Sequence, residues 1–127
     1  MEKDFDARND KKKRIHNRGQ IPYFHEREVW WCTLGLNVGS EQDGGNRYMR
    51  PILILKKFNQ YTFWGIPLTT SKSRNPYLIK IPHTRSLANL SQLRLISTKR
   101  LESQMYVVSE DTFKKIVKGI RSLLPRV

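Results

Sequence analysis

The sequence predicts a mainly β (α+β) fold, in which a small, strongly curved barrel or sheet is closed by a C-terminal helix. Roughly five to seven short runs of β-branched and aromatic residues follow one another, bounded by Gly, Asn and Pro, as expected of paired strands. After them, apolar residues recur at three- and four-residue spacing, the period of one helix face. With 127 residues the chain is long enough for one such domain and too short for two.

Residues 1–26 are expected to form a basic N-terminal arm and linker, followed by the barrel domain at 27–127. The arm is densely charged, with four consecutive cations at Lys11–Arg14. A short helix over residues 7–16 could bury only a thin apolar stripe, and Pro22 would stop any helix before the domain. The arm is therefore interpreted as an RNA-contacting or docking element, or as a mobile tail.

The first expected strand, residues 28–36, contains Trp30, Trp31 and Cys32. Adjacent strand residues point to opposite faces, so one Trp should enter the core while the other covers a second layer or a subunit interface. Cys32 is interpreted as a small core residue rather than a nucleophile. As the single cysteine it excludes an intramolecular disulfide.

The next two apolar runs, Ile52–Leu55 and the stretch that ends in Thr69–Thr70, are separated by a polar turn at 57–60. A short turn between antiparallel strands brings the start of the first strand beside the end of the second. Arg50 and the two threonines should therefore lie at the same end of one hairpin, beside the Gly-rich loop at 35–46. A guanidinium and two hydroxyls gathered in this way are typical of a phosphate site.

The remaining elements are a short half-buried strand at 77–81, a strand pair or one bent strand at 87–96, a final strand at 105–108 and the helix. In the second of these, Leu93 and Leu95 are expected to face the same way. The helix should begin after Ser109, a good N-cap, with two acids in its first turn, where the helix dipole favours negative charge.

Charge favours a polyanionic partner. The net charge is +13, and no acidic residue occurs between Gly44 and Leu101. Such a distribution draws in nucleic acid, whereas a solvated basic surface is the plainer interpretation. Neither cofactor nor metal is expected, because Cys32 and the three histidines have no metal-ligand spacing. No apolar run is long enough for a bilayer span, and the charged N-terminus is unlike a signal peptide, so we expect a cytoplasmic protein without membrane association.

Four segments, in order, resemble the MazF/PemK family of type II toxin–antitoxin endoribonucleases over residues 27–124. They are the strand leading into Gly39-Ser40-Glu41-Gln42, Arg50-Pro51 before an apolar strand, Pro67-Leu68-Thr69, and the stretch Ser91–Leu101. The resemblance implies an SH3-like barrel and a homodimer. It also implies metal-independent cleavage of single-stranded RNA to a 2′,3′-cyclic phosphate and a 5′-hydroxyl, and neutralisation by a cognate antitoxin protein.

The same resemblance suggests catalytic roles for Arg50, Thr69 and Glu41. Arg50 would clamp the phosphate, and Thr69 matches the family's functional threonine. Glu41 is the nearby carboxylate that the motif supplies; it would act as general base, or else position the loop or contact the antitoxin. At Ser91 this chain lacks the acid that family members carry. The expected substrate contacts are Ser40, Gln42, Gly44, Arg47, Thr70, Ser71, Ser91 and Gln92.

Two other functions compete with the nuclease. Because of Ser91, a catalytically inactive nucleic-acid-binding module of the same fold is one alternative function. A DNA-gyrase-poisoning toxin with a similar barrel is the other alternative, but such relatives act through C-terminal aromatic contacts, and this chain ends in Arg-Ser-Leu-Leu-Pro-Arg-Val without a Trp.

If Glu41 is the general base, Glu41→Gln should flatten the rising limb of the pH–rate profile for RNA cleavage, because the amide cannot accept the 2′-OH proton. The profile would be measured on a single-stranded RNA of fixed sequence. An unchanged profile would remove Glu41 from the role of base.

Overall fold

The computed structural model describes residues 21–33, 48–71 and 75–127. The strands are β1 (Glu28–Thr33), β2 (Met49–Lys57), β3 (Thr62–Thr69), β4 (Leu78–Lys80), β5 (Leu87–Asn89), β6 (Arg94–Ser97) and β7 (Leu101–Val107). Two 3-10 turns, η1 (Leu90–Gln92) and η2 (Thr98–Arg100), flank β6, and helix α3 (Glu110–Leu123) ends the fold. The predicted mainly β class with a C-terminal helix is confirmed. Residues 1–20 of the expected arm and the whole Gly-rich loop lie outside the described residues.

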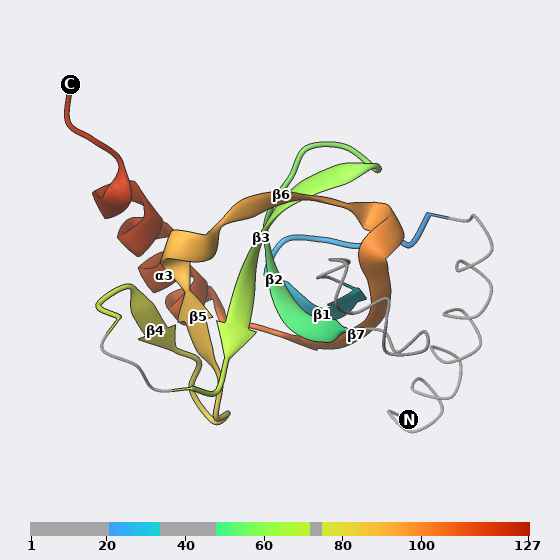
Figure 1. Cartoon of the computed structure of the whole chain (residues 1–127), viewed down its shortest axis with the longest axis horizontal. Coiled ribbons are helices and arrows are strands. Elements are labelled where there is room, and N and C mark those ends of the chain that lie inside the picture. The colour runs from blue at the N-terminus through green and yellow to red at the C-terminus, as the bar shows by residue number, and fades with distance from the viewer. Residues whose placement is uncertain (1–20, 34–47, 72–74) are drawn as a thin grey trace.

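The strands form one antiparallel, strongly curved sheet in the order β4-β5-β3-β2-β1-β7, with β6 also paired to β3. Figure 1 shows this sheet curling around a central space, while α3 lies beside β4 and β5. The path ends at β4 on one side and at β7 on the other. Among the described strands, the sheet is therefore barrel-like without being closed.

Strand β3 is the centre of this arrangement. One of its edges pairs with β2, and the other pairs first with β6 at residues 62–65 and then with β5 at residues 68–69. Continuing the β5 register along β3 would set Gly65 opposite Ser91, yet Gly65 pairs with Arg94, three residues later. The three residues of η1 account for this step. Pro67, which has no N–H to donate, falls in the gap between the two ladders, as is common for proline at ladder interruptions.

Two apolar clusters cover opposite faces of the sheet. The cluster inside the curl includes Phe24, Ile52, Ile54 and Phe63, and the cluster under α3 includes Leu53 and Ile116. Because β2 is covered on both faces, its apolar run is continuous instead of alternating with polar residues. As predicted, one of the two tryptophans enters the core: Trp30 is buried, whereas Trp31 is 36% exposed.

The structure differs from three sequence expectations. Phe24, in the expected linker, is fully buried, with its ring 5.4 Å from that of Phe63. The stretch 87–96 forms two strands split by η1, which is one of its two predicted forms, but Leu95 is 61% exposed whereas Ile96 is buried in the cluster inside the curl. The last strand begins at Leu101 instead of residue 105, directly after η2.

Helix α3 begins as predicted, with the Ser109 hydroxyl accepting a hydrogen bond from Thr112 N–H at 3.2 Å. It packs tightly against the η1 turn. A Cβ added at Gly119 would lie 2.5 Å from Leu90 Cδ1 and 3.2 Å from Ile79 Cδ1. The position of η1 is therefore set by β3 on one side and by the helix on the other. No helix in the described part of the chain is long and apolar enough to cross a membrane.

Gly65→Ala should destabilise the fold by about 1–3 kcal/mol through overpacking. The added Cβ would lie 2.5 Å from Ile52 Cγ2 and 2.8 Å from Ile96 Cδ1, where β3 passes between β2 and β6. Urea denaturation would measure the change in the free energy of unfolding. Ile96→Val removes the Cδ1 atom, so the double variant should lose less stability than the two single changes add up to. Strict additivity would contradict the packing explanation.

Candidate functional site

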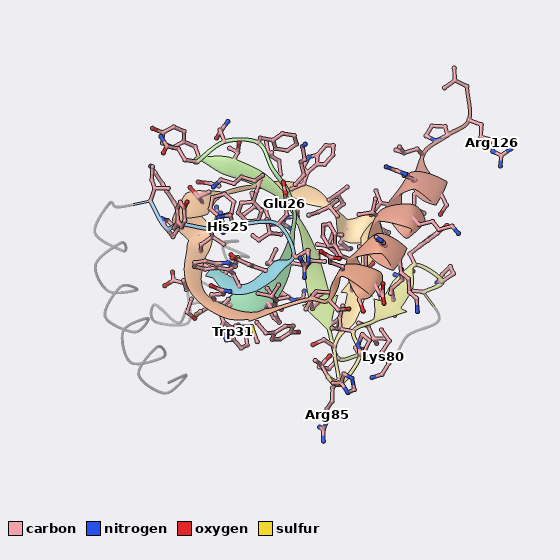
Figure 2. The ribbon with its side chains drawn as sticks, turned by 180° about the vertical axis from the view of Figure 1, so that it is seen from behind. His25, Glu26, Trp31, Lys80, Arg85 and Arg126 are labelled. Atoms are coloured by element: carbon pink, nitrogen blue, oxygen red, sulfur yellow. The ribbon has the colours of Figure 1, made fainter. Side chains whose placement is uncertain are left out.

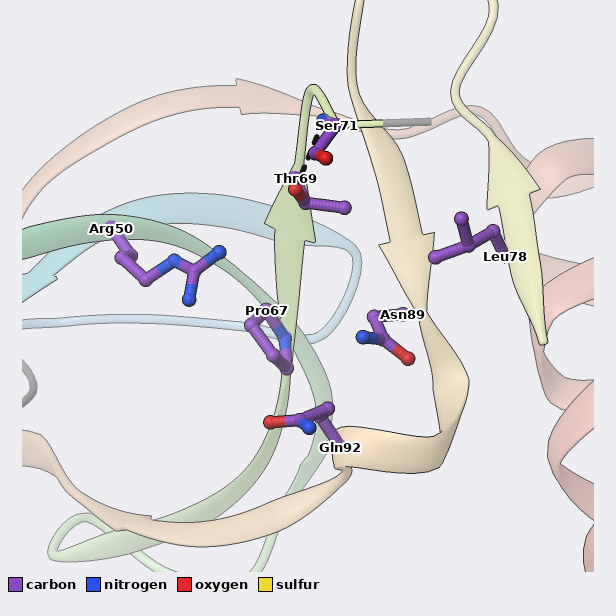
Figure 3. Close-up of a pocket in the computed structure, with 7 residues that line it drawn as sticks. All are labelled: Arg50, Pro67, Thr69, Ser71, Leu78, Asn89 and Gln92. Carbon is purple, nitrogen blue, oxygen red and sulfur yellow. Dashed lines mark hydrogen bonds between the residues drawn. The ribbon is translucent and has the colours of Figure 1, made fainter. Parts of the chain in front are cut away.

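The β2–β3 register brings Arg50 and Thr69 together. Ile52 pairs with Pro67, and Arg50 and Thr69 each lie two residues farther along, so they lie opposite each other on one face. Both line a hollow of about 200 Å³, shown in Figure 3. The expected meeting of these two side chains at one end of the hairpin is therefore present.

The hollow lies beside η1, the turn at which the chain leaves the edge of β3 between β5 and β6. Its walls come from five separate elements and from the second residue after β3; they are Arg50, Pro67, Thr69, Ser71, Leu78, Asn89 and Gln92. Sites that enclose a drug-sized ligand commonly hold about 300–1,000 Å³. A smaller, open hollow suits one group of an extended polymer.

The side chain of Thr69 is held in place by the backbone N–H of Ser71. Its Oγ1 accepts a hydrogen bond from the Ser71 N–H at 3.1 Å, drawn as a dashed line in Figure 3. This bond fixes the side chain and leaves the hydroxyl hydrogen to donate elsewhere. The exposed Ser71 hydroxyl lies beside it. Two hydroxyl donors therefore stand at the rim of the hollow.

Arg50 supplies the positive charge of the hollow. Its side chain is half-buried and extends toward Pro67 in Figure 3, and its guanidinium carbon lies 6.0 Å from the centre of the Tyr48 ring. That separation is at the outer limit of a cation–π contact. No carboxylate is among the described residues that line the hollow. Lys80 and Arg85 project from the same β4–β5 end of the molecule, as Figure 2 shows.

Only some of the other predicted site residues line the hollow. Gln92 lines the hollow with Arg50, Thr69 and Ser71, whereas Thr70 and Ser91 are exposed and do not line it. The loop candidates lie outside the described residues; they are Ser40, Glu41, Gln42, Gly44 and Arg47.

Sequence reasoning missed Pro67, Leu78 and Asn89 as lining residues. Asn89 carried a signal, because a carboxamide between Ala88 and Leu90 interrupts an apolar strand segment. Pro67 was singled out only as part of the Pro67-Leu68-Thr69 motif, and Leu78 carried no signal, since both fit equally well as structural residues of a strand.

Cys32 takes no part in this chemistry. It is fully buried, and burial, with the nearby Glu102 as a second cause, raises the pKa of its thiol far above the ordinary range. The thiolate needed of a nucleophile is therefore disfavoured. Within the described ranges, no group of three or more His, Cys, Asp and Glu is placed to hold a metal ion.

Solved structures of similar fold include an endoribonuclease bound to its cognate antitoxin and a MazE–MazF structure. An endoribonuclease in complex with its cognate antitoxin, from a mycobacterial species, is 18% identical, with a TM-score of 0.64 over 83% of this chain and 100% of that one. MazE–MazF from Deinococcus radiodurans is 16% identical, with a TM-score of 0.66 over 81% of this chain and 95% of that one. At these identities the likeness shows the fold. No curated protein sequence matches the chain.

A family model gives a more specific result than the structural likeness. The model described as PemK-like, MazF-like toxin of type II toxin–antitoxin system matches residues 25–124. The match spans both strands that carry Arg50 and Thr69, the η1 turn and helix α3. The chain therefore belongs to the PemK-like, MazF-like toxin family of type II toxin–antitoxin systems.

Proposed function

We propose that the chain is a sequence-selective, metal-independent endoribonuclease that cleaves single-stranded RNA as the toxin of a toxin–antitoxin pair. The observation that carries the proposal is the convergence of Arg50, Thr69 and Ser71 on one open hollow without a carboxylate among its described lining residues. Such a donor-rich, cationic surface suits a phosphodiester. Membership of the toxin family and the net charge of +13 support RNA as the polyanion.

In this proposal Arg50 and Thr69 hold the scissile phosphate. The guanidinium fork donates to the non-bridging oxygens, and the Thr69 hydroxyl, held by the Ser71 N–H, donates to the same group or orients the nucleophile. Charge on these oxygens rises in the phosphorane-like transition state, so donors already in position stabilise it more than the ground state. The backbone of Arg50 is paired with Cys32 and that of Thr69 with Leu87, and this pairing holds both residues in position before substrate arrives.

The bonds change in a single displacement. A base, proposed to be Glu41, removes the proton from the 2′-OH, and the 2′-oxygen forms a bond to phosphorus as the bond from phosphorus to the 5′-oxygen breaks. The leaving 5′-oxygen takes a proton and becomes a free hydroxyl. The other product is a 2′,3′-cyclic phosphate, and no water is consumed in this step.

Arg50→Ala should lower the cleavage rate by roughly 100- to 1,000-fold, because it removes a preorganised donor to the developing charge. Arg50→Lys should recover part of the loss, since it restores charge without the bidentate fork. Purified protein would be incubated with a long single-stranded RNA in excess EDTA, and the fragment ends mapped. Lys56→Ala is the matched control: it removes an exposed cation from the same strand, outside the hollow.

A wild-type rate retained by folded Arg50→Ala would remove Arg50 from the site. Binding of RNA by the wild type without any cleavage would instead favour the inactive binding module. The inactive binding module is supported by Ser91, which occupies the position where family members carry an acid. Its hydroxyl is hydrogen-bonded to Asn89 at 2.9 Å and supplies no proton acceptor of carboxylate type.

The proposal includes a homodimer, a cytoplasmic location and a cognate antitoxin protein, the last because solved structures of similar fold are toxin–antitoxin complexes. The net charge of +13 favours an acidic antitoxin segment. An apolar surface suited to protein contact lies at the β2–β3 turn and on the neighbouring parts of β3 and β6. It consists of Phe58, Tyr61, Trp64 and Leu95, which are 41–61% exposed.

If this apolar surface joins two copies, the protein should sediment at twice the 15.1 kDa of the chain, and Trp64→Ser combined with Leu95→Ser should shift it to the single mass. Trp64 and Leu95 are cross-strand neighbours, so the double change removes adjoining contact area. Met105→Ser, which alters an exposed apolar residue on β7, should leave the mass unchanged. Sedimentation of the wild type at the single mass would contradict the homodimer.

A further inference from the structure

The side chain of Asn89 does not cap the turn that follows it. Asn89 ends β5 and stands at the N-cap position of η1, where asparagine commonly caps the turn, yet it makes no side-chain cap hydrogen bond. Its Oδ1 instead accepts from Asn75 Nδ2 at 3.3 Å and from the Ser91 hydroxyl at 2.9 Å. Both acceptor contacts fall on the oxygen of the amide.

A backbone donor fixes the direction of this amide. The Tyr77 N–H, which can only donate, bonds to Asn75 Oδ1 at 2.8 Å. Asn75 must therefore donate a hydrogen bond from Nδ2 to Asn89, and Asn89 must accept it with Oδ1. The Asn89 Nδ2 is left facing the hollow, and Figure 3 shows the nitrogen on the side toward Pro67. No hydrogen bond from this nitrogen is made within the described residues, so its two hydrogens are available to a ligand.

The hollow has two chemically different sides. Arg50, Thr69 and Ser71 form the charged and hydroxylic side. Across the Pro67 ring, Leu78 and Asn89 form a neutral side that combines an apolar surface with an amide, as Figure 3 shows. Phosphate is held by charge and hydroxyls, whereas base edges are read by carboxamides and apolar contacts.

We propose that Asn89 is a specificity-determining residue that reads the base of a nucleotide next to the scissile phosphate. Its Nδ2 donates to an exocyclic keto oxygen, as in uracil or guanine, and disfavours the exocyclic amino group of cytosine or adenine, which would set donor against donor. Asn75 is a positioning residue that acts through Asn89. The inference rests on the proposed function, since it takes RNA as the substrate of this hollow.

Asn89→Asp reverses the hydrogen-bonding character at this point while keeping the shape of the side chain. One carboxylate oxygen can still accept from Asn75 and Ser91, so the local structure should be retained, while the other oxygen now faces the hollow as an acceptor. The preference at one position of the cleavage site should move from keto to amino bases, by roughly 10- to 100-fold in relative rate. Single-stranded RNA with a random window, cleaved and mapped by sequencing, would measure it.

Asn75→Asp tests the relay without touching the hollow. The carboxylate still accepts from the Tyr77 N–H but cannot donate to Asn89, so the Asn89 amide should turn over, giving Nδ2 to the carboxylate and Oδ1 to the hollow. Base preference should therefore shift in the same direction as in Asn89→Asp. Asn59→Asp is the matched control, because Asn59 Oδ1 accepts from the backbone N–H two residues on, at 2.7 Å, in the β2–β3 turn. It should leave base preference unchanged.

A binding selection separates failure of this inference from failure of the proposed function. The same random-window RNA carrying 2′-O-methyl groups cannot be cut by 2′-OH attack, so its enriched sequences report recognition alone. Keto enrichment in the wild type and amino enrichment in both variants would support the role of Asn89, even if the normal RNA were left uncut and the nuclease proposal failed.

Two results would overturn the inference while the nuclease proposal stands. One is cleavage by the wild type with no keto preference at any position. The other is a uniform loss of cleavage across all sequences in Asn89→Asp, which would indicate that the amide contacts a phosphate oxygen. A wild type that neither binds nor cuts either RNA would overturn both proposals.

Discussion

The pairing of β2 with β3 in a single register is the constraint on which the rest of the structure depends. Ile52 and Pro67 are partners, so Arg50 and Thr69 face each other at the open end of the hairpin. A slip of one residue would turn Arg50 to the opposite face and would exchange the β2 residues that pack in the two apolar clusters. The same burial that stabilises the sheet therefore also fixes the distance between the cation and the hydroxyl.

The second constraint is the three-residue step between β5 and β6 along β3. On the edge of β3 that faces away from β2, the step leaves a gap near Pro67 between the two ladders, and the turn η1 lies at this gap. Helix α3 supports η1 from the other side through the close approach of Gly119 to Leu90. The hollow thus exists because a ladder is interrupted, and its far wall is held in place by core packing rather than by loop conformation.

Donors in the hollow are oriented by backbone groups rather than by other charges. The Ser71 N–H holds Thr69, and the Tyr77 N–H directs Asn75 and, through it, Asn89. Backbone N–H groups cannot change protonation state or act as acceptors, so orientations set by them persist when a polyanion enters. This arrangement favours electrostatic stabilisation by groups already in position.

The sequence by itself determined the fold class, the helix with its Ser109 cap, the burial of Cys32 and the nearness of Arg50 to Thr69, because each depends on local periodicity, composition or a short hairpin. It also determined the family, through motifs that are contiguous in the chain. Only the tertiary structure decided which residues of β6 are buried, the burial of Phe24 and the place of Asn89 in the hollow. These depend on the step in the β3 ladders and on contacts between segments distant in sequence, which no local pattern encodes.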